Sequence, residues 1–166
     1  MDCLRSQREE KNITIYDLMD EILVVCPRCQ ALAYITSVCS DSTTVPTYFQ
    51  ARRLVCRGCE LSQDWASQSV GYDWHADPMR DPYFKLPLYL QTKYRQYVLW
   101  AYNECHLLLL EQYIASSLRG SKPVPQYGWH NQSLFSRLPK WMIVAKHRPG
   151  LLKAISKLKQ EKLGTN

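Results

Sequence analysis

The chain has 166 residues, of which 46% are hydrophobic and 22% charged, and a formal net charge of +6. This length allows one domain, or a small metal-stapled unit joined to a helical unit. The first residues are polar and charged, so we expect no signal peptide. The most apolar stretch, Val98 to Ile114, contains Glu104 and Glu111, which excludes a membrane span there. We therefore expect a cytoplasmic protein with no membrane partner.

The positive charge is concentrated at the C-terminus. From Arg137 onward, eight Lys and Arg residues stand against Glu161 alone, so this segment carries +7 and the preceding 136 residues carry −1. Such asymmetry points to an anionic partner, which can be nucleic acid, a membrane surface or an acidic protein. The alternative is that these basic residues only form the solvent-exposed face of a helix and bind no partner.

The first informative motif is a pair of CxxC turns, Cys26-Pro27-Arg28-Cys29 and Cys56-Arg57-Gly58-Cys59. Two residues between cysteines allow one tight turn to direct both thiolates at one ion, and two such turns complete a tetrahedral Zn²⁺ site. Four thiolates leave no coordination position for water or substrate, so the ion is structural. The spacing therefore predicts one structural zinc on Cys26, Cys29, Cys56 and Cys59. Redox or disulfide-bonded pairs are disfavoured, because no helical pattern follows either motif.

The sequence around the cysteines is typical of β-strands. Ile22 to Val25 precedes the first pair and Ala31 to Ile35 follows it, while Leu54-Val55 leads into the second pair and Ser62 to Val70 can form an edge strand. The interval between the pairs is 26 residues, and closing a long loop costs little more than closing a short one. We expect a zinc ribbon over residues 13–72.

The remaining cysteines, Cys3, Cys39 and Cys105, have no CxxC partner. An odd total of seven argues against a full disulfide framework. We expect free thiols at these positions, as is usual in a reducing compartment.

Residues 73–102 form an aromatic and proline-rich connector with two short strands that turn near Lys93 to Gln96. The best catalytic candidates lie here, and they are Asp73, His75, Asp77 and Asp81. Such groups can hold a cation and activate water. Their spacing matches no helix-borne metal motif, and Asp-Pro pairs usually form turns. We assign no catalytic residue and favour a protein that is not an enzyme.

Residues 103–163 have a helical pattern. Asn103 is a good N-cap for a helix to about residue 118, whose apolar face carries Leu107, Leu110 and Ile114. After a Pro-rich loop over residues 121–132, Ser133 starts a short helix that Pro139 interrupts or restarts. His147 to Gly150 break the chain before a last, basic helix. These helices should pack, with Trp100 and Trp141, in one core. The fold class expected is α+β, an antiparallel four-cysteine zinc ribbon packed with a mainly helical C-terminal half.

Several short motifs give the chain a family resemblance. They are Arg53 to Cys59, Asp81 to Phe84, Leu86 to Thr92, Leu99 to Asn103 and Ser136 to Met142. From Cys26 onward the chain resembles small bacterial zinc-ribbon proteins of unassigned function, which are loosely similar to the ribbon of the transcription factor TFIIB. The resemblance implies the zinc ribbon but no mechanism.

The chain departs from that family at two places. Gln30 and Glu60 stand where members often have glycine after each CxxC. Lys93-Tyr94-Arg95 stand where many members have Cys-Cys-Gly, so any role of those thiols is absent.

The function that these features favour is a nucleic-acid-binding accessory protein. Its phosphate-contacting residues are predicted to be Arg28, Arg52, Arg53, Arg57, Lys153, Lys157 and Lys159. Tyr48, Phe49 and Trp65 can stack on unpaired bases, although packing within the ribbon is the commoner role for each aromatic residue taken singly. The alternative is a protein–protein adaptor that docks on a larger complex through the ribbon and the aromatic connector. A metal-dependent hydrolase or nuclease is the third hypothesis.

Overall fold

The computed structural model describes residues 14–38, 50–65, 69–73, 76–116 and 134–164. Its strands are β1 (Glu21–Val25), β2 (Leu32–Ser37), β3 (Arg52–Val55), β4 (Ser62–Asp64), β5 (Leu90–Tyr94) and β6 (Tyr97–Ala101). Its helices are η1 (Ile15–Leu18), α1 (Glu104–Ala115), η3 (Leu134–Arg137), α2 (Lys140–Ile143), η4 (Ala145–His147) and α3 (Arg148–Leu163). The predicted α+β fold is confirmed.

Strands β1 to β4 form a four-stranded antiparallel sheet in chain order. Val25 pairs with Leu32 and Val55 pairs with Ser62, so the β1–β2 and β3–β4 connections lie at the same end of the sheet. Each of these connections is a CxxC turn. The simple up-and-down order of the strands therefore brings together two motifs that are far apart in the sequence.

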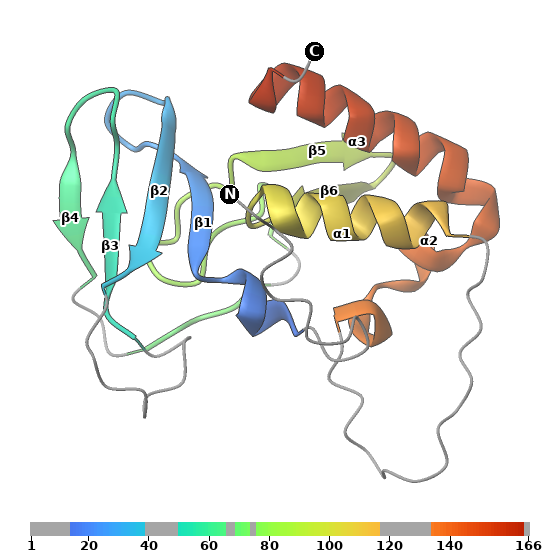
Figure 1. The fold of residues 1–166 in the computed structure, drawn as a ribbon, viewed down its shortest axis with the longest axis horizontal. Helices are drawn as coiled ribbons and strands as arrows, with labels where there is room; N and C mark the ends of the chain where they lie inside the picture. The colour runs from blue at the N-terminus through green and yellow to red at the C-terminus, as the bar shows by residue number, and fades with distance from the viewer. Residues whose placement is uncertain (1–13, 39–49, 66–68, 74–75, 117–133, 165–166) are drawn as a thin grey trace, which may run out of the picture.

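A second, two-stranded sheet is formed by β5 and β6, and it turns between Tyr94 and Tyr97 as expected. Helix α3 contacts β5, helix α1 contacts β6, and the two helices contact each other, so both helices pack along this hairpin (Figure 1).

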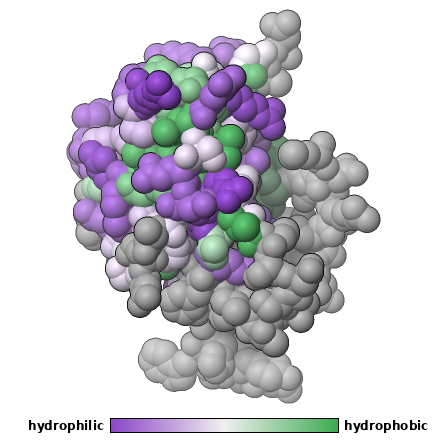
Figure 2. Space-filling view, turned by 90° about the vertical axis from the view of Figure 1, so that its left-hand side faces the viewer, coloured by the Kyte–Doolittle hydropathy of each residue, from purple (hydrophilic) through white to green (hydrophobic). Residues whose placement is uncertain are grey.

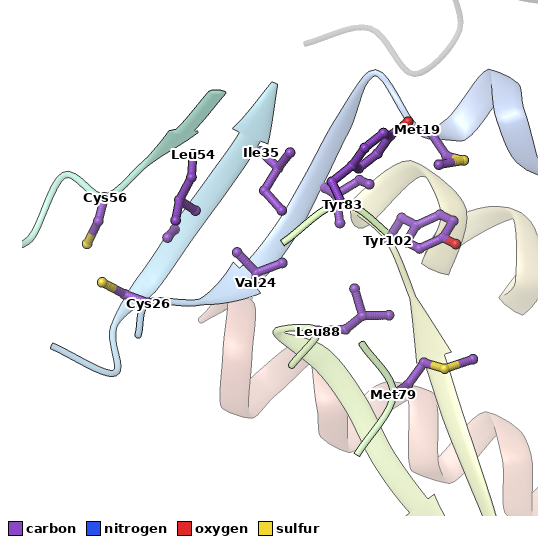
Figure 3. Close-up of a cluster of buried hydrophobic side chains, with 12 residues drawn as sticks. Met19, Val24, Cys26, Ile35, Leu54, Cys56, Met79, Tyr83, Leu88 and Tyr102 are labelled. Carbon is purple, nitrogen blue, oxygen red and sulfur yellow. The ribbon is translucent and has the colours of Figure 1, made fainter. Parts of the chain in front are cut away.

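The described side chains form two buried clusters. The first begins at Cys26 and Cys56, runs along the ribbon through Val24 and Leu54, and reaches Tyr83 in the connector (Figure 3). The second lies between the β5–β6 hairpin and the helices. Its buried members include Leu90, Leu99, Leu107, Leu110, Ile114, Leu151, Ile155 and Leu158.

Strand β1 belongs to both clusters. Ile22 and Val24 point into the first cluster and Leu23, between them, points into the second, as alternation along a strand requires. The edge of β1 that faces away from β2 is also occupied, because Leu23 N–H donates to Tyr102 O (2.7 Å) and Tyr89 N–H donates to Leu23 O (2.9 Å). The ribbon and the hairpin are therefore joined through β1.

Helix α1 begins where the sequence predicts. The side chain of Asn103 accepts a hydrogen bond from His106 N–H (2.9 Å) and donates to the carbonyls of Leu18 and Glu21 (2.8 Å each). The N-cap thus ties the helix to the chain that enters β1. The predicted apolar face of α1 is buried in the second cluster. The predicted single core is wrong, because Trp100 is partly buried against the first cluster and Trp141 is partly buried against the second.

The predicted break at His147 to Gly150 is wrong. Helix α3 starts at Arg148, with Pro149 in its first turn, where a missing N–H loses no helical hydrogen bond. Gly150 faces Tyr94 of β5, and a Cβ at this position would lie 2.7 Å from the Tyr94 hydroxyl oxygen. The glycine therefore permits close docking of α3 on the hairpin and does not end a helix.

Candidate metal centre

The four cysteines of the CxxC turns converge at the end of the ribbon. Their Sγ atoms all lie within 4.8 Å of one another. Cys26 Sγ is 3.6 Å from Cys59 Sγ, and Cys29 Sγ is 3.5 Å from Cys56 Sγ. A tetrahedral ion with metal–sulfur bonds of about 2.3 Å holds its sulfurs about 3.8 Å apart. The predicted cysteines are therefore placed to hold one metal ion.

Backbone hydrogen bonds shape both turns. Cys26 N–H donates to Ala31 O (2.8 Å), Gln30 N–H donates to Cys26 O (3.0 Å), and Cys56 N–H donates to Leu61 O (2.8 Å). In the first turn, Arg28 N–H also points at Cys26 Sγ (3.4 Å). Such N–H groups stabilise a thiolate, because they direct partial positive charge at the sulfur.

The four thiols perturb one another electrostatically. Burial raises the pKa of Cys26, but hydrogen bonds from Cys29 N–H and Arg28 N–H outweigh it and lower this pKa to about 6. At Cys29 the Ala31 N–H lowers the pKa, but contact with the Cys56 thiol and burial raise it, to about 12. Four thiolates this close repel one another, so a cation bound between them is what would allow all four to ionise together.

Each turn closes with a left-handed residue. Gln30 has φ of 62° and Glu60 has φ of 58°. A side chain in this conformation costs about 1 kcal/mol or more, because Cβ crowds the following carbonyl. Each turn therefore contains a small, local strain.

Gln30→Gly and Glu60→Gly should each stabilise the metal-loaded protein, by about 0.5–1 kcal/mol, because glycine adopts positive φ without steric cost. Urea denaturation at saturating Zn²⁺ measures the change. The matched control is Gln63→Gly in β4, where φ is not positive and glycine should destabilise. If Gln30→Gly lost as much stability as Gln63→Gly, the positive φ of Gln30 would not be a source of strain.

Two of the predicted phosphate-contacting arginines stand in the CxxC turns and are exposed. Arg28 Nη1 donates to Cys59 O (3.5 Å), which links the two turns. The Arg57 guanidinium lies 5.2 Å from the centre of the Tyr34 ring, within cation–π range. Within the described ranges, neither arginine forms an ion pair.

The prediction that Arg52 belongs to the nucleic-acid-binding surface is wrong, because its side chain is buried. Its side chain is 0% exposed, and Nη1 donates to Met19 O (2.6 Å) while the guanidinium lies 4.8 Å from the centre of the Tyr83 ring. Alternation along β3 places Arg52 on the same face as buried Leu54, which is the sequence signal that identifies it as a core residue.

Arg53, on the opposite face of β3, is exposed but already paired. Its guanidinium makes two hydrogen bonds to Asp64 of β4, of 2.6 and 3.2 Å. This interaction raises the pKa of Arg53 and lowers the pKa of Asp64. A phosphate would have to compete with that carboxylate.

The three predicted lysines of α3 differ in their surroundings. Lys159 is half-buried and forms an ion pair with Glu111, so it fastens α3 to α1. Lys157 pairs with Glu161 (3.5 Å) one turn away on the exposed surface, and Lys153 is exposed with no ion pair to a described residue. Lys153 and Lys157 therefore remain accessible, whereas Lys159 has a structural partner.

Among the described residues, the aromatic side chains predicted to stack on bases and the acidic side chains considered for catalysis do not gather into a site. Trp65 packs edge-on against Tyr83 (5.2 Å between ring centres), as a ribbon core residue would; Tyr48, Phe49 and His75 lie outside those residues. Asp77 pairs with Lys93 (3.1 Å).

Asp81 is buried, and its carboxylate accepts hydrogen bonds from three backbone N–H groups, those of Tyr83, Phe84 and Leu86 (2.7–2.8 Å). Burial raises the pKa of Asp81 against the effect of these bonds. Asp81 thus shapes a turn of the connector and is not poised to bind a metal.

Cys105, in α1, is disulfide-bonded, so the predicted free thiol is wrong at this position. Cys3 and Cys39 lie outside the described residues.

Within the ranges that the structure covers, no helix has the length and apolarity that crossing a membrane requires. Comparisons of the chain with protein-family models, with curated proteins and with solved structures find no match. The resemblance to bacterial zinc-ribbon proteins therefore stays a prediction.

Proposed function

We propose that this protein binds nucleic acid and that a single structural Zn²⁺ on Cys26, Cys29, Cys56 and Cys59 shapes its binding surface. Zinc is the metal that four thiolates usually hold in a structural site. The ion has no open coordination position, so it fixes the geometry of the two turns and takes no part in a reaction. The function then resides in what those turns present to solvent.

The observation that carries the proposal is the pair of exposed arginines within the metal-holding turns. Arg28 and Arg57 have no acidic partner among the described residues, unlike Arg53. A guanidinium without a carboxylate partner is available to phosphate, which it recognises through paired N–H groups. The metal holds the backbone beneath both arginines, which reduces the entropy lost on binding.

Helix α3 supplies a second group of cations. Its exposed lysines include Lys153 and Lys157 on the middle turns of the helix. The C-terminal end of α3 is the end nearer the ribbon (Figure 1). Phosphate contacts from two elements would neutralise a longer stretch of backbone than one turn can reach.

The surface is less suited to an adaptor. The large hydrophobic side chains exposed among the described residues are Val38, Ile143 and Val144, and none of these is aromatic. The ribbon side of the molecule is mostly hydrophilic, with hydrophobic residues in smaller groups between (Figure 2). Protein interfaces usually depend on aromatic or arginine anchors in an apolar surround, and the exposed arginines on this side have no exposed aromatic residue among the described residues beside them.

Reversal of charge on the proposed surface should weaken binding to every sequence alike. We expect Arg28→Glu/Arg57→Glu and Lys153→Glu/Lys157→Glu each to lower affinity at least tenfold, at ~1.4 kcal/mol per decade. The slope of log affinity against log salt should fall by about 0.9 for each duplex phosphate that the variant no longer neutralises. Fluorescence anisotropy on single- and double-stranded oligonucleotides at several salt concentrations measures both quantities.

The control is Arg80→Glu/Lys93→Glu, which makes the same change in net charge on the connector and hairpin. Zinc content should equal that of the parent in all three variants, because none alters a cysteine. Equal weakening by the control would show that net charge alone acts, and a parent that binds neither oligonucleotide at low salt would refute the proposal.

A further inference from the structure

A pocket of about 380 Å³ lies between β6, α1 and the segment from η3 to α2. This volume falls in the range of small-molecule sites, which are typically apolar with a few polar groups. The apolar lining includes Val98, Trp100, Leu110, Leu138 and Met142. The pocket is far from the cysteines in the fold, since its lining comes from the hairpin and the helices.

One of its two ionisable lining residues, His106, is a buried hydrogen-bond donor. The residue as a whole is 2% exposed, and Nδ1 accepts a hydrogen bond from Tyr102 N–H (3.2 Å). Because a backbone N–H can only donate, Nδ1 is unprotonated and the proton is on Nε2. No described residue accepts a hydrogen bond from that N–H.

The ring of His106 is also neutral. Burial lowers the pKa of His106 to about 3, and Trp100 lies edge-on to it with 5.5 Å between ring centres. The imidazole therefore offers a hydrogen-bond donor without a charge.

The other ionisable lining residue is Arg137, which is exposed and forms no ion pair within the described ranges. No acidic side chain from the described part of the chain lines the pocket. An apolar cavity with a guanidinium and a neutral N–H donor on its wall is complementary to an apolar molecule with one negative group.

We propose that this pocket binds a small monocarboxylate with an apolar body. The body occupies the space between Trp100, Leu110 and Met142, the carboxylate pairs with Arg137, and His106 Nε2–H donates to it. The site is separate from the proposed nucleic-acid surface and does not depend on it.

Octanoate tests the proposal, with octan-1-ol as a neutral probe of the same chain length. Titration calorimetry on the zinc-loaded full chain should show one octanoate site and binding of octanol at least tenfold weaker. Arg137→Gln should weaken octanoate about tenfold, as expected for loss of a charged hydrogen-bond partner. Lys140→Gln, a neighbouring exposed cation that does not line the pocket, should leave affinity unchanged. In ¹⁵N spectra of the histidine side chains, octanoate should shift Nε2 of His106.

Equal affinity for octanol and octanoate would overturn carboxylate recognition, as would equal effects of Arg137→Gln and Lys140→Gln. Octanoate binding that leaves the His106 resonances unmoved would place the ligand elsewhere and refute the site. Absence of binding by both probes would refute it as well.

Discussion

Cys56→Ser is expected to abolish stoichiometric zinc binding and to unfold the ribbon strands. The parent should carry about one Zn²⁺ per chain. Cys26 and Cys56 are fully buried members of the first cluster, so the metal site is continuous with the ribbon core. A structural zinc contributes on the order of 10 kcal/mol, which is comparable to the whole stability of a small domain. Elemental analysis measures the metal, and amide hydrogen exchange over residues 21–64 measures the strands.

The control for this change is Val55→Ser, a polar substitution beside the ligand. It should lose some stability but retain one equivalent of zinc. Amides of α1 and α3 should keep partial protection in Cys56→Ser, because Leu107, Leu151 and Ile155 belong to the second cluster. Unchanged zinc content, or unchanged protection of the ribbon amides, would show that the cysteines do not hold the fold.

Arg52→Ala is expected to destabilise the zinc-loaded protein by about 3 kcal/mol or more. Truncation leaves a cavity in the first cluster and removes the donor to the carbonyls of Met19 and Asp20 (2.6 and 3.3 Å). Unsatisfied buried groups cost about 1–3 kcal/mol and large core truncations about 2–5 kcal/mol. Truncation also removes the guanidinium from the face of the Tyr83 ring.

The adjacent Arg53→Ala provides a matched comparison. It removes an exposed pair with Asp64, so the expected change is below about 1 kcal/mol. Urea denaturation of both variants at saturating Zn²⁺ gives the two values. If the two variants lost similar amounts of unfolding free energy, the contrast between a buried Arg52 and an exposed Arg53 would be wrong.

Features set by short-range spacing could be predicted from the sequence. The CxxC turns, the N-cap at Asn103 and the apolar face of α1 each depend on residues within a few positions, and the structure confirms them. The ribbon strands are predictable for the same reason, because β-prone segments flank the cysteines.

Features that depend on tertiary partners could not be predicted. Lys159 pairs with Glu111, 48 positions earlier in the chain, and nothing local marks that pairing. From the sequence alone Gly150 suggests a helix break, and only the structure shows that it allows close packing against Tyr94. Arg52 is different, because alternation with Leu54 indicates burial, whereas residue type alone suggests a phosphate-binding side chain.

The dual packing of β1 has a consequence for how the protein can be divided. A fragment that ends near residue 72 would lose the carbonyl of Tyr102 that bonds β1, and would expose Leu23 to water. A fragment of the helical half alone would lack the same leucine from its interior. Neither half is therefore a module that gene fusion can move to another protein. We expect the two halves to be inherited together. The residue at position 23 should be restricted by the packing of both halves.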